Sequence, residues 1–134
     1  MAAGTIEALC SDHQPHDADA KEAPFPETAP GISALETLLP LTLCLVAEGV
    51  LDLPTAIARL TMGPAAILGH PPGRDLGCIR PGRPADVCVF DPQESWVPGR
   101  ETLLSHGMSS PFLGVVLRGR VRWTLLAGRA VFER

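Results

Sequence analysis

Residues 5–16 read T-I-E-A-L-C-S-D-H-Q-P-H, a short apolar run that ends in a carboxylate and two imidazoles. This pattern predicts a buried strand over residues 5–11, with Asp12 at its carboxyl end. In (β/α)8 barrels the reactive side chains lie at that end of the strands, which favours an active-site role for Asp12 and His16. A structural alternative stays open at this point, in which Asp12 caps a turn and the histidines lie on the surface, because D-H-x-x-H is not a specific metal motif.

A helical region follows a polar loop that ends near Gly31. Ser33 and Glu36 form an S-x-x-E capping box, which predicts the start of a helix that continues to about residue 48. Pro40 lies inside this helix and is expected to kink it or to tighten its first turns. Gly49 is expected to end the helix as its C′ residue.

The rest of the chain changes from helical to β patterning. Residues 53–69 predict two short helices, separated at a Gly-Pro pair. Residues 86–91 read as a strand, and residues 115–133 read as three strands with turns near Gly119 and Gly128. The sequence therefore predicts an α/β protein with helices first and a small antiparallel β unit after them.

Composition and charge exclude several classes of protein. The chain has 134 residues, 46% of them hydrophobic, and a formal net charge of −4, which argues against an ordinary basic nucleic-acid binder. The longest apolar stretch, residues 38–47, is too short to span a bilayer, so no membrane association is expected. No C-x-x-C pair occurs, and Cys10, Cys44 and Cys88 lie in apolar runs typical of buried, reduced thiols. A cytoplasmic location is therefore expected.

Several blocks, in order along the chain, resemble the dihydroorotase branch of the amidohydrolase superfamily. The blocks are D-H-Q-P-H (12–16), K-E-A-P-F (21–25), P-G-I-S-A-L-E-T-L-L-P-L (30–41), G-C-I-R-P-G-R-P-A-D-V-C-V-F-D (77–91), S-S-P-F-L-G (109–114) and G-R-V-R-W-T-L-L-A-G-R-A-V-F (119–132). The resemblance implies the C-terminal fragment of a (β/α)8 TIM barrel, its last strand and helices, followed by a small antiparallel β-sandwich unit. It implies a division into residues 1–70, the end of the barrel, and residues 71–134, a portion of the β-sandwich domain.

The same resemblance assigns roles to four residues. Asp12 matches a catalytic general acid/base that is also a zinc ligand, and His16 matches a substrate-binding histidine. Pro30 and Gly31 match the place where the loop backbone meets the substrate ring. Gln14 stands where the family usually has alanine, which we do not interpret as a loss of function.

The remaining metal ligands of the family are absent from this sequence. It contains no H-x-H pair. Its only lysine, Lys21, is expected in a mobile loop and is no candidate for a carboxylated ligand. The zinc centre, binuclear or mononuclear in the complete enzyme, would therefore draw its other ligands from outside this sequence.

The implied activity is zinc-dependent, reversible hydrolysis of the cyclic amide of dihydroorotate to N-carbamoyl-aspartate, a step of pyrimidine biosynthesis. The complete form is expected to be a homo-oligomer, and this chain alone is expected to be inactive. One alternative is another cyclic amidohydrolase, a hydantoinase or allantoinase. A second is a non-catalytic dihydroorotase-like subunit that supports aspartate carbamoyltransferase.

Outside these four residues, the sequence favours structural roles. His13 is expected to make a structural hydrogen bond, and Asp86 is expected at a turn or strand entry. Trp96 and Trp123 are expected to pack within the β-sandwich, and His106 is expected to be solvated.

Overall fold

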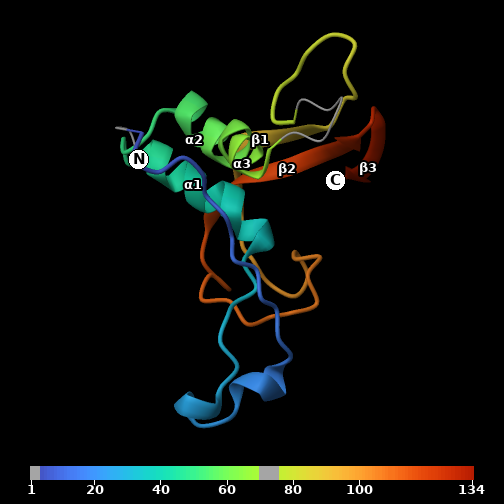
Figure 1. The fold of residues 1–134 in the computed structure, drawn as a ribbon. Coiled ribbons are helices and arrows are strands. Elements are labelled where there is room, and N and C mark those ends of the chain that lie inside the picture. The colour runs from blue at the N-terminus through green and yellow to red at the C-terminus, as the bar shows by residue number, and fades with distance from the viewer. Residues whose placement is uncertain (1–3, 70–75) are drawn as a thin grey trace.

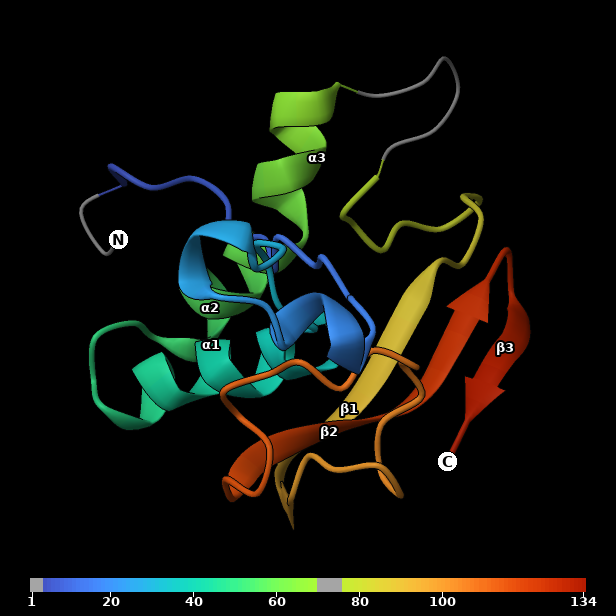
Figure 2. The same cartoon turned by 90° about the horizontal axis from the view of Figure 1, so that it is seen from below.

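The computed structural model describes residues 4–69 and 76–134, with helices in the first half and an antiparallel sheet in the second (Figures 1 and 2). The elements are η1 (Ala18–Lys21), η2 (Phe25–Glu27), η3 (Leu35–Thr37), α1 (Leu38–Ala47), α2 (Leu53–Leu60), α3 (Met62–Leu68), β1 (Val87–Trp96), β2 (Leu117–Leu126) and β3 (Arg129–Glu133). The proposed boundary at residue 70 lies outside the described residues. None of the described helices is long and apolar enough to cross a membrane.

The sheet has the order β1-β2-β3, and both neighbouring pairs are antiparallel. A two-residue turn, Ala127-Gly128, joins β2 to β3, and both residues have positive φ, 50° and 81°. This backbone matches the twist of a hairpin, and it confirms the turn predicted near Gly128. Asp86 lies directly before β1, as expected of a strand-entry residue, and its Oδ1 accepts the Ala127 N–H of the turn at 2.7 Å.

The turn predicted near Gly119 is absent, because β2 runs through this residue as one strand. Gly119 has φ +100°, and a Cβ there would lie 2.3 Å from Cδ1 of Leu43 in α1. Its carbonyl accepts the indole N–H of Trp96 at 3.0 Å. The glycine therefore serves the close approach of α1 to the sheet.

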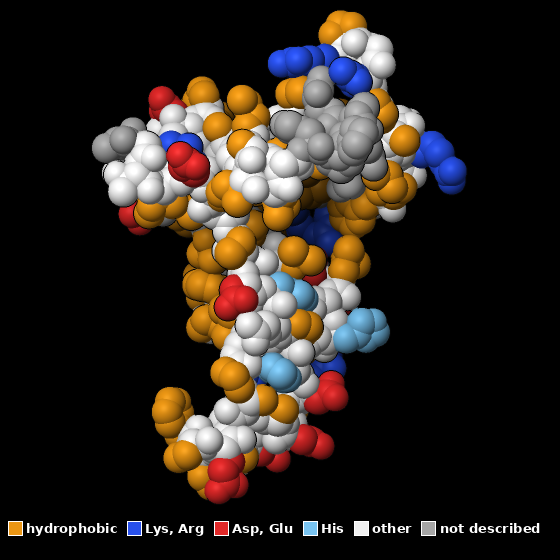
Figure 3. Space-filling model, in the orientation of Figure 1, with side chains coloured by type: hydrophobic (Ala, Val, Ile, Leu, Met, Phe, Trp, Pro, Cys, Tyr) orange, Lys and Arg blue, Asp and Glu red, His pale blue; other side chains and the backbone are white. Residues whose placement is uncertain are grey.

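The apolar core lies where the helices meet this sheet. Its buried hydrophobic residues are Ala34, Leu43, Leu51, Ala56, Ala65, Trp96 and Leu117. Trp96 packs inside as predicted, whereas Trp123 is 40% exposed and corrects the corresponding expectation. Many large apolar side chains remain on the surface, among them Leu35, Ile67, Leu68, Ile79 and Val116, and orange side chains cover much of the face in Figure 3.

Helix α1 ends as predicted but begins differently. Its end is a Schellman motif: Gly49, with φ +71°, donates to the Val46 carbonyl, and Val50 donates to the Leu45 carbonyl at 2.9 Å. At its start no side chain caps the helix, so the predicted capping box is wrong. Pro40 lies in the first turn of α1, directly after the tighter turn of η3, where a proline is tolerated.

The start of α2 and the end of α3 are set by residues next to each helix. Asp52 is the N-cap of α2, and its carboxylate accepts the Thr55 N–H at 2.7 Å. Hydrogen bonds from Thr55 hold the pKa of Asp52 below its usual value. Gly69, with φ +76°, follows the last residue of α3, as the sequence predicts.

The strand predicted over residues 5–11 does not form. This segment runs in extended conformation across the helices, and its Leu9 N–H donates to the Arg59 carbonyl of α2 at 2.9 Å. In the described part of the chain no neighbouring strand pairs with it, which is the physical reason for the difference. Cys10 is consequently exposed rather than buried. Cys88 is also an exposed residue, although partial shielding of its thiol raises its pKa.

Candidate active site

The segment that follows residue 11 turns away from the helices and, with η1 and η2, forms a projecting loop (Figure 1). Asp12 lies at its base with φ +44°, a left-handed conformation that aspartate tolerates better than most residues. Its side chain is exposed, and Oδ1 accepts a hydrogen bond from Nε2 of Gln14 at 3.1 Å. The second oxygen, Oδ2, has no hydrogen-bond donor among the described residues, so it faces solvent.

His13 ties the two ends of this loop together. Its Nδ1 accepts the N–H groups of Ala34 and Leu35 at 3.0 and 3.1 Å, and these lie at the start of η3. The Gln14 N–H also donates to the Ile32 carbonyl at 2.9 Å. The predicted structural role of His13 is therefore confirmed: it closes the loop that carries Asp12 and His16.

The structure brings three of the predicted site residues together across the loop. Nε2 of His16 donates to the carbonyl of Pro30 at 2.8 Å. Gly31 lies so close to Gln14 that an added Cβ would be 2.4 Å from Cβ of Gln14. Because Gln14 also donates to Asp12, one short network connects Asp12 with His16, Pro30 and Gly31.

Lys21 departs from its expectation, since it is bonded within the loop and not free in it. Its ammonium donates to the carbonyl of Ala29, and to the carbonyl of Gly31 at 2.7 Å. These partners lie eight and ten residues further along the chain. Lys21 follows the D-H-Q-P-H block closely in the sequence. No residue next to Lys21 indicates that its ammonium binds these two carbonyls.

A cavity of about 510 Å³ lies beside His16. It is lined by Pro15, His16, Asp17, Ala20, Ser105, His106 and Gly107. The exposed His106 therefore faces the same space as His16, although the sequence analysis gave it no role. Gly107 packs so closely on this loop that a Cβ would lie 2.5 Å from Cβ of Pro15. In Figure 3 pale-blue histidines gather on this part of the molecule, and acidic side chains gather at the end of the projecting loop.

Glu36, predicted as a helix cap, holds the loop after β1 instead. Its Oε1 accepts the N–H groups of Leu104 and Ser105 at 2.8 and 2.9 Å. The Ser33 hydroxyl also lies 3.0 Å from the Ser105 hydroxyl. The two residues read as a capping box thus fix the Ser105 end of the cavity, 68 to 72 residues away in the sequence.

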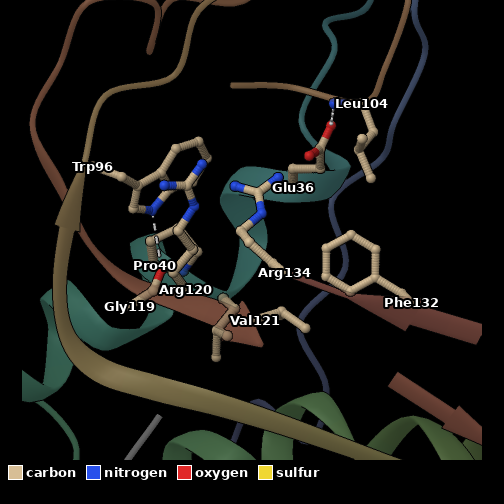
Figure 4. Close-up of a pocket in the computed structure, with 10 residues that line it drawn as sticks. Glu36, Pro40, Trp96, Leu104, Gly119, Arg120, Val121, Phe132 and Arg134 are labelled. Carbon is tan, nitrogen blue, oxygen red and sulfur yellow. Dashed lines mark hydrogen bonds between the residues drawn. The ribbon is translucent and has the colours of Figure 1, made fainter. Parts of the chain in front are cut away.

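A second, smaller cavity of about 170 Å³ lies between α1 and the sheet (Figure 4). Trp96 and Phe132 supply part of its apolar wall, and the guanidinium of Arg120 lies 5.0 Å from the Trp96 ring centroid. Arg120 also pairs with Glu94 at 3.5 Å. The charge of Arg120 is therefore paired with that of Glu94 inside the protein. We assign this cavity to the packing of α1 on the sheet.

Comparisons with known proteins place this site in a class. No family model matches the chain. The solved structure of an L-hydantoinase (dihydropyrimidinase) from Arthrobacter aurescens superposes with a TM-score of 0.85 and 29% identity, over 98% of this chain and 30% of that one. The fold of this chain therefore matches part of a cyclic amidohydrolase.

Curated relatives narrow the class to one family. A "Dihydroorotase-like protein" of Pseudomonas aeruginosa is 52% identical over 130 residues, 97% of this chain and 30% of that relative. A "Dihydroorotase" of Geobacter metallireducens is 42% identical over 131 residues, 98% of this chain and 30% of that relative. Over nearly its whole length the chain is homologous to proteins named dihydroorotase or dihydroorotase-like, and it corresponds to the C-terminal portion of these relatives. It spans about 30% of their length.

Proposed function

We propose that this chain is the C-terminal part of a dihydroorotase, which reversibly hydrolyses the cyclic amide of dihydroorotate to N-carbamoyl-aspartate in pyrimidine biosynthesis. The observation that carries the proposal is the hydrogen bond from His16 to the Pro30 carbonyl. It brings two separate blocks of the family resemblance, 12–16 and 30–41, to one place, in a chain that matches dihydroorotases over nearly its whole length.

We propose that the chain contributes to two domains of the complete enzyme. Residues 1–70 would complete a TIM barrel, and residues 71–134 would form a portion of its β-sandwich domain. The exposed apolar side chains on the helices, such as Leu35 and Leu68, support this, because a soluble protein of this size rarely leaves so many uncovered. The complete enzyme is expected in the cytoplasm, as a homo-oligomer acting on small molecules.

The residues present fit a zinc centre only in part. Asp12 offers a carboxylate with a free oxygen, but residues 4–69 and 76–134 contain no group of three His, Cys, Asp or Glu side chains that could hold a metal. When bound, zinc would make the attacking water more acidic and would polarise the amide carbonyl. In the proposed enzyme the other ligands would come from the part that precedes the matched region.

Asp12 is the residue that we propose to move the proton. Its free Oδ2 can accept a proton from the attacking water and return it to the ring nitrogen that leaves, so one carboxylate serves first as base and then as acid. The amide of Gln14 holds Oδ1 and leaves Oδ2 without a donor among the described residues, which keeps Oδ2 available for a proton. Gln14 in place of the family's alanine is therefore compatible with catalysis.

His16 is the residue that we propose to bind the carboxylate of the substrate. Its Nε2–H is used on the Pro30 carbonyl, so only Nδ1 is available to the adjacent cavity. A neutral ring with its proton on Nε2 has no N–H at Nδ1, whereas an imidazolium donates from both nitrogens. A substrate carboxylate in that cavity would therefore accept a hydrogen bond from His16 only where Nδ1 carries a proton.

A fusion protein tests the proposal. It joins the part of the Geobacter metallireducens dihydroorotase that precedes the matched region to this chain. We expect it to hydrolyse dihydroorotate, and the preceding part alone serves as the control. Faster turnover of hydantoin or allantoin than of dihydroorotate would instead identify one of the other cyclic amidohydrolases, which the hydantoinase fold also allows.

A second candidate function rests on the relatives' names. The relative with 52% identity is named dihydroorotase-like, whereas the one with 42% is named dihydroorotase. The name dihydroorotase-like is compatible with a non-catalytic subunit, for which support of aspartate carbamoyltransferase is the proposed role. A second fusion, to the preceding part of the Pseudomonas aeruginosa relative, separates the two: this alternative predicts co-purification with aspartate carbamoyltransferase of that organism and no hydrolysis.

The chain alone should retain no stoichiometric zinc and should not turn over dihydroorotate. Asp12 is a single ligand where a zinc centre needs at least three, and incomplete ligand sets bind weakly. Metal analysis after dialysis against buffer checks this, together with an assay of the unfused chain. One zinc per chain after dialysis, or hydrolysis above background, would contradict the prediction.

The His16→Ala variant of the fusion protein should mainly raise KM. Loss of a hydrogen bond to a charged group, worth about 1.5–3 kcal/mol, corresponds to a rise of roughly 10- to 100-fold. The effect on kcat should be smaller, because His16 binds the substrate and does not move the reacting proton. Steady-state kinetics with dihydroorotate measure both constants, and an unchanged KM would remove His16 from the binding site.

A further inference from the structure

Among the described residues, the ammonium of Lys21 is bound to backbone carbonyls alone. It donates to the carbonyls of Ala29 and Gly31, and the side chain is half-buried against the loop. Acidic residues stand near it in the sequence, at Asp19 and Glu22, yet no ion pair joins Lys21 to a carboxylate of the described residues. A lysine that is bound in this way is unusual, because most lysines leave the ammonium in water.

The two carbonyls lie on either side of Pro30. The carbonyl between them, that of Pro30, is bound by His16 at 2.8 Å. Lys21 and His16 therefore hold three consecutive carbonyls, with Lys21 on the first and third and His16 on the second. Gly31, with φ +103°, allows the chain to take this path, and its contact with Gln14 limits movement toward Asp12.

We infer that Lys21 is a positioning residue of the active site: it fixes the backbone at Pro30–Gly31 and, through the Pro30 carbonyl, the imidazole of His16. The inference rests on the proposed function, because it needs His16, Pro30 and Gly31 to be the residues that meet the substrate. Lys21 itself stays bonded to the loop and touches no reacting atom.

Lys21 is the single lysine of the chain, so its bonds can be observed directly. In the 134-residue chain labelled with ¹⁵N-lysine, we expect one side-chain NH₃⁺ resonance whose protons exchange slowly and show contacts to Ala29 and Gly31. A rapidly exchanging ammonium without such contacts would overturn the inference without any variant. This measurement therefore decides the point even if a substitution prevents folding.

Variants separate positioning from simple loop stabilisation. In Lys21→Met, the NMR signals of the His16 ring should shift, while those of His106, which is not bonded to Pro30, stay in place. Lys21→Arg should restore the His16 signals, since a guanidinium also donates to two carbonyls. Glu22→Gln, at the exposed neighbouring position, is the matched control and should leave them unchanged. A loop that becomes sensitive to protease at the exposed Phe25 while the His16 signals stay fixed would show a structural role only, and would overturn the inference.

Kinetics of the fusion protein separate this inference from the proposed function. Lys21→Met should lower kcat/KM on the order of 10- to 100-fold, mainly through KM, because a small misplacement of binding groups is costly. An active fusion protein with an unchanged KM in Lys21→Met would overturn the inference and leave the proposed function standing. An inactive fusion protein in which the His16 signals still respond to Lys21 would overturn the proposed function and retain the link between the two side chains.

Discussion

The Asp12→Asn variant of the fusion protein is expected to lose roughly 10²- to 10⁴-fold in kcat, the usual contribution of a general acid–base. Asparagine keeps the shape of the side chain and can still meet Nε2 of Gln14 through its amide oxygen. It cannot accept and return a proton at the position of Oδ2, and it is a poorer ligand for zinc. The loss should therefore appear in kcat even where dihydroorotate still binds.

A matched control lies in the same loop. Asp19→Asn makes the same chemical change at an exposed position in η1, and it should leave kcat near that of the unmodified fusion protein. Steady-state rates and metal content, measured on both variants, separate lost proton transfer from lost zinc. If Asp12→Asn kept near-normal turnover with its metal bound, Asp12 would not be the acid–base.

Features with short-range signals were predictable from the sequence. Gly49 ends α1, and Ala127-Gly128 forms a hairpin turn, because each needs a backbone conformation that glycine adopts readily. The α/β class, with helices before an antiparallel sheet, followed from the change in periodicity after residue 70. In the candidate site, the resemblance named Asp12 and His16, and the local role of His13 was also anticipated.

Features that depend on distant partners were not predictable. Glu36 stands where a capping box is expected, but its carboxylate is bound by backbone groups 68 and 69 residues away. Gly119 reads as a turn, yet it is a glycine because Leu43 of α1 needs its space. Lys21 was placed in a mobile loop because nothing in its immediate sequence indicates that it binds the carbonyls around Pro30.

A second large effect, on stability, is expected from a substitution that faces residues 5–11, the segment predicted as a strand. Gly63→Ala is expected to destabilise the chain, by about 1–3 kcal/mol for overpacking against a fixed neighbour. Gly63 lies in the first turn of α3, where helix propensity alone favours alanine by up to about 1 kcal/mol. An added Cβ, however, would lie 1.9 Å from the backbone carbonyl oxygen of Glu7. The sign of the change therefore reports whether residues 5–11 lie on the helices.

Backbone cannot move aside here as a flexible side chain can. The Glu7 carbonyl is two residues from Leu9, whose N–H is bound to the Arg59 carbonyl at 2.9 Å. To admit a methyl group, the segment must lift from α3 and stretch that bond to α2. We therefore expect the Leu9 amide to exchange faster with solvent in Gly63→Ala, in addition to the loss of stability.

Gly99→Ala is the matched control, because nothing lies within 4 Å of a Cβ at that position. Urea unfolding followed by the fluorescence of the buried Trp96 gives the free energy for both variants, and hydrogen exchange reports on Leu9. A Gly63→Ala chain that is more stable than the parent, with Leu9 exchange unchanged, would show that helix propensity prevails and that residues 5–11 lie elsewhere. A less stable Gly63→Ala with an unaffected Gly99→Ala would place the segment that leads into Asp12 on α2 and α3. The helices would then set where the active-site loop begins.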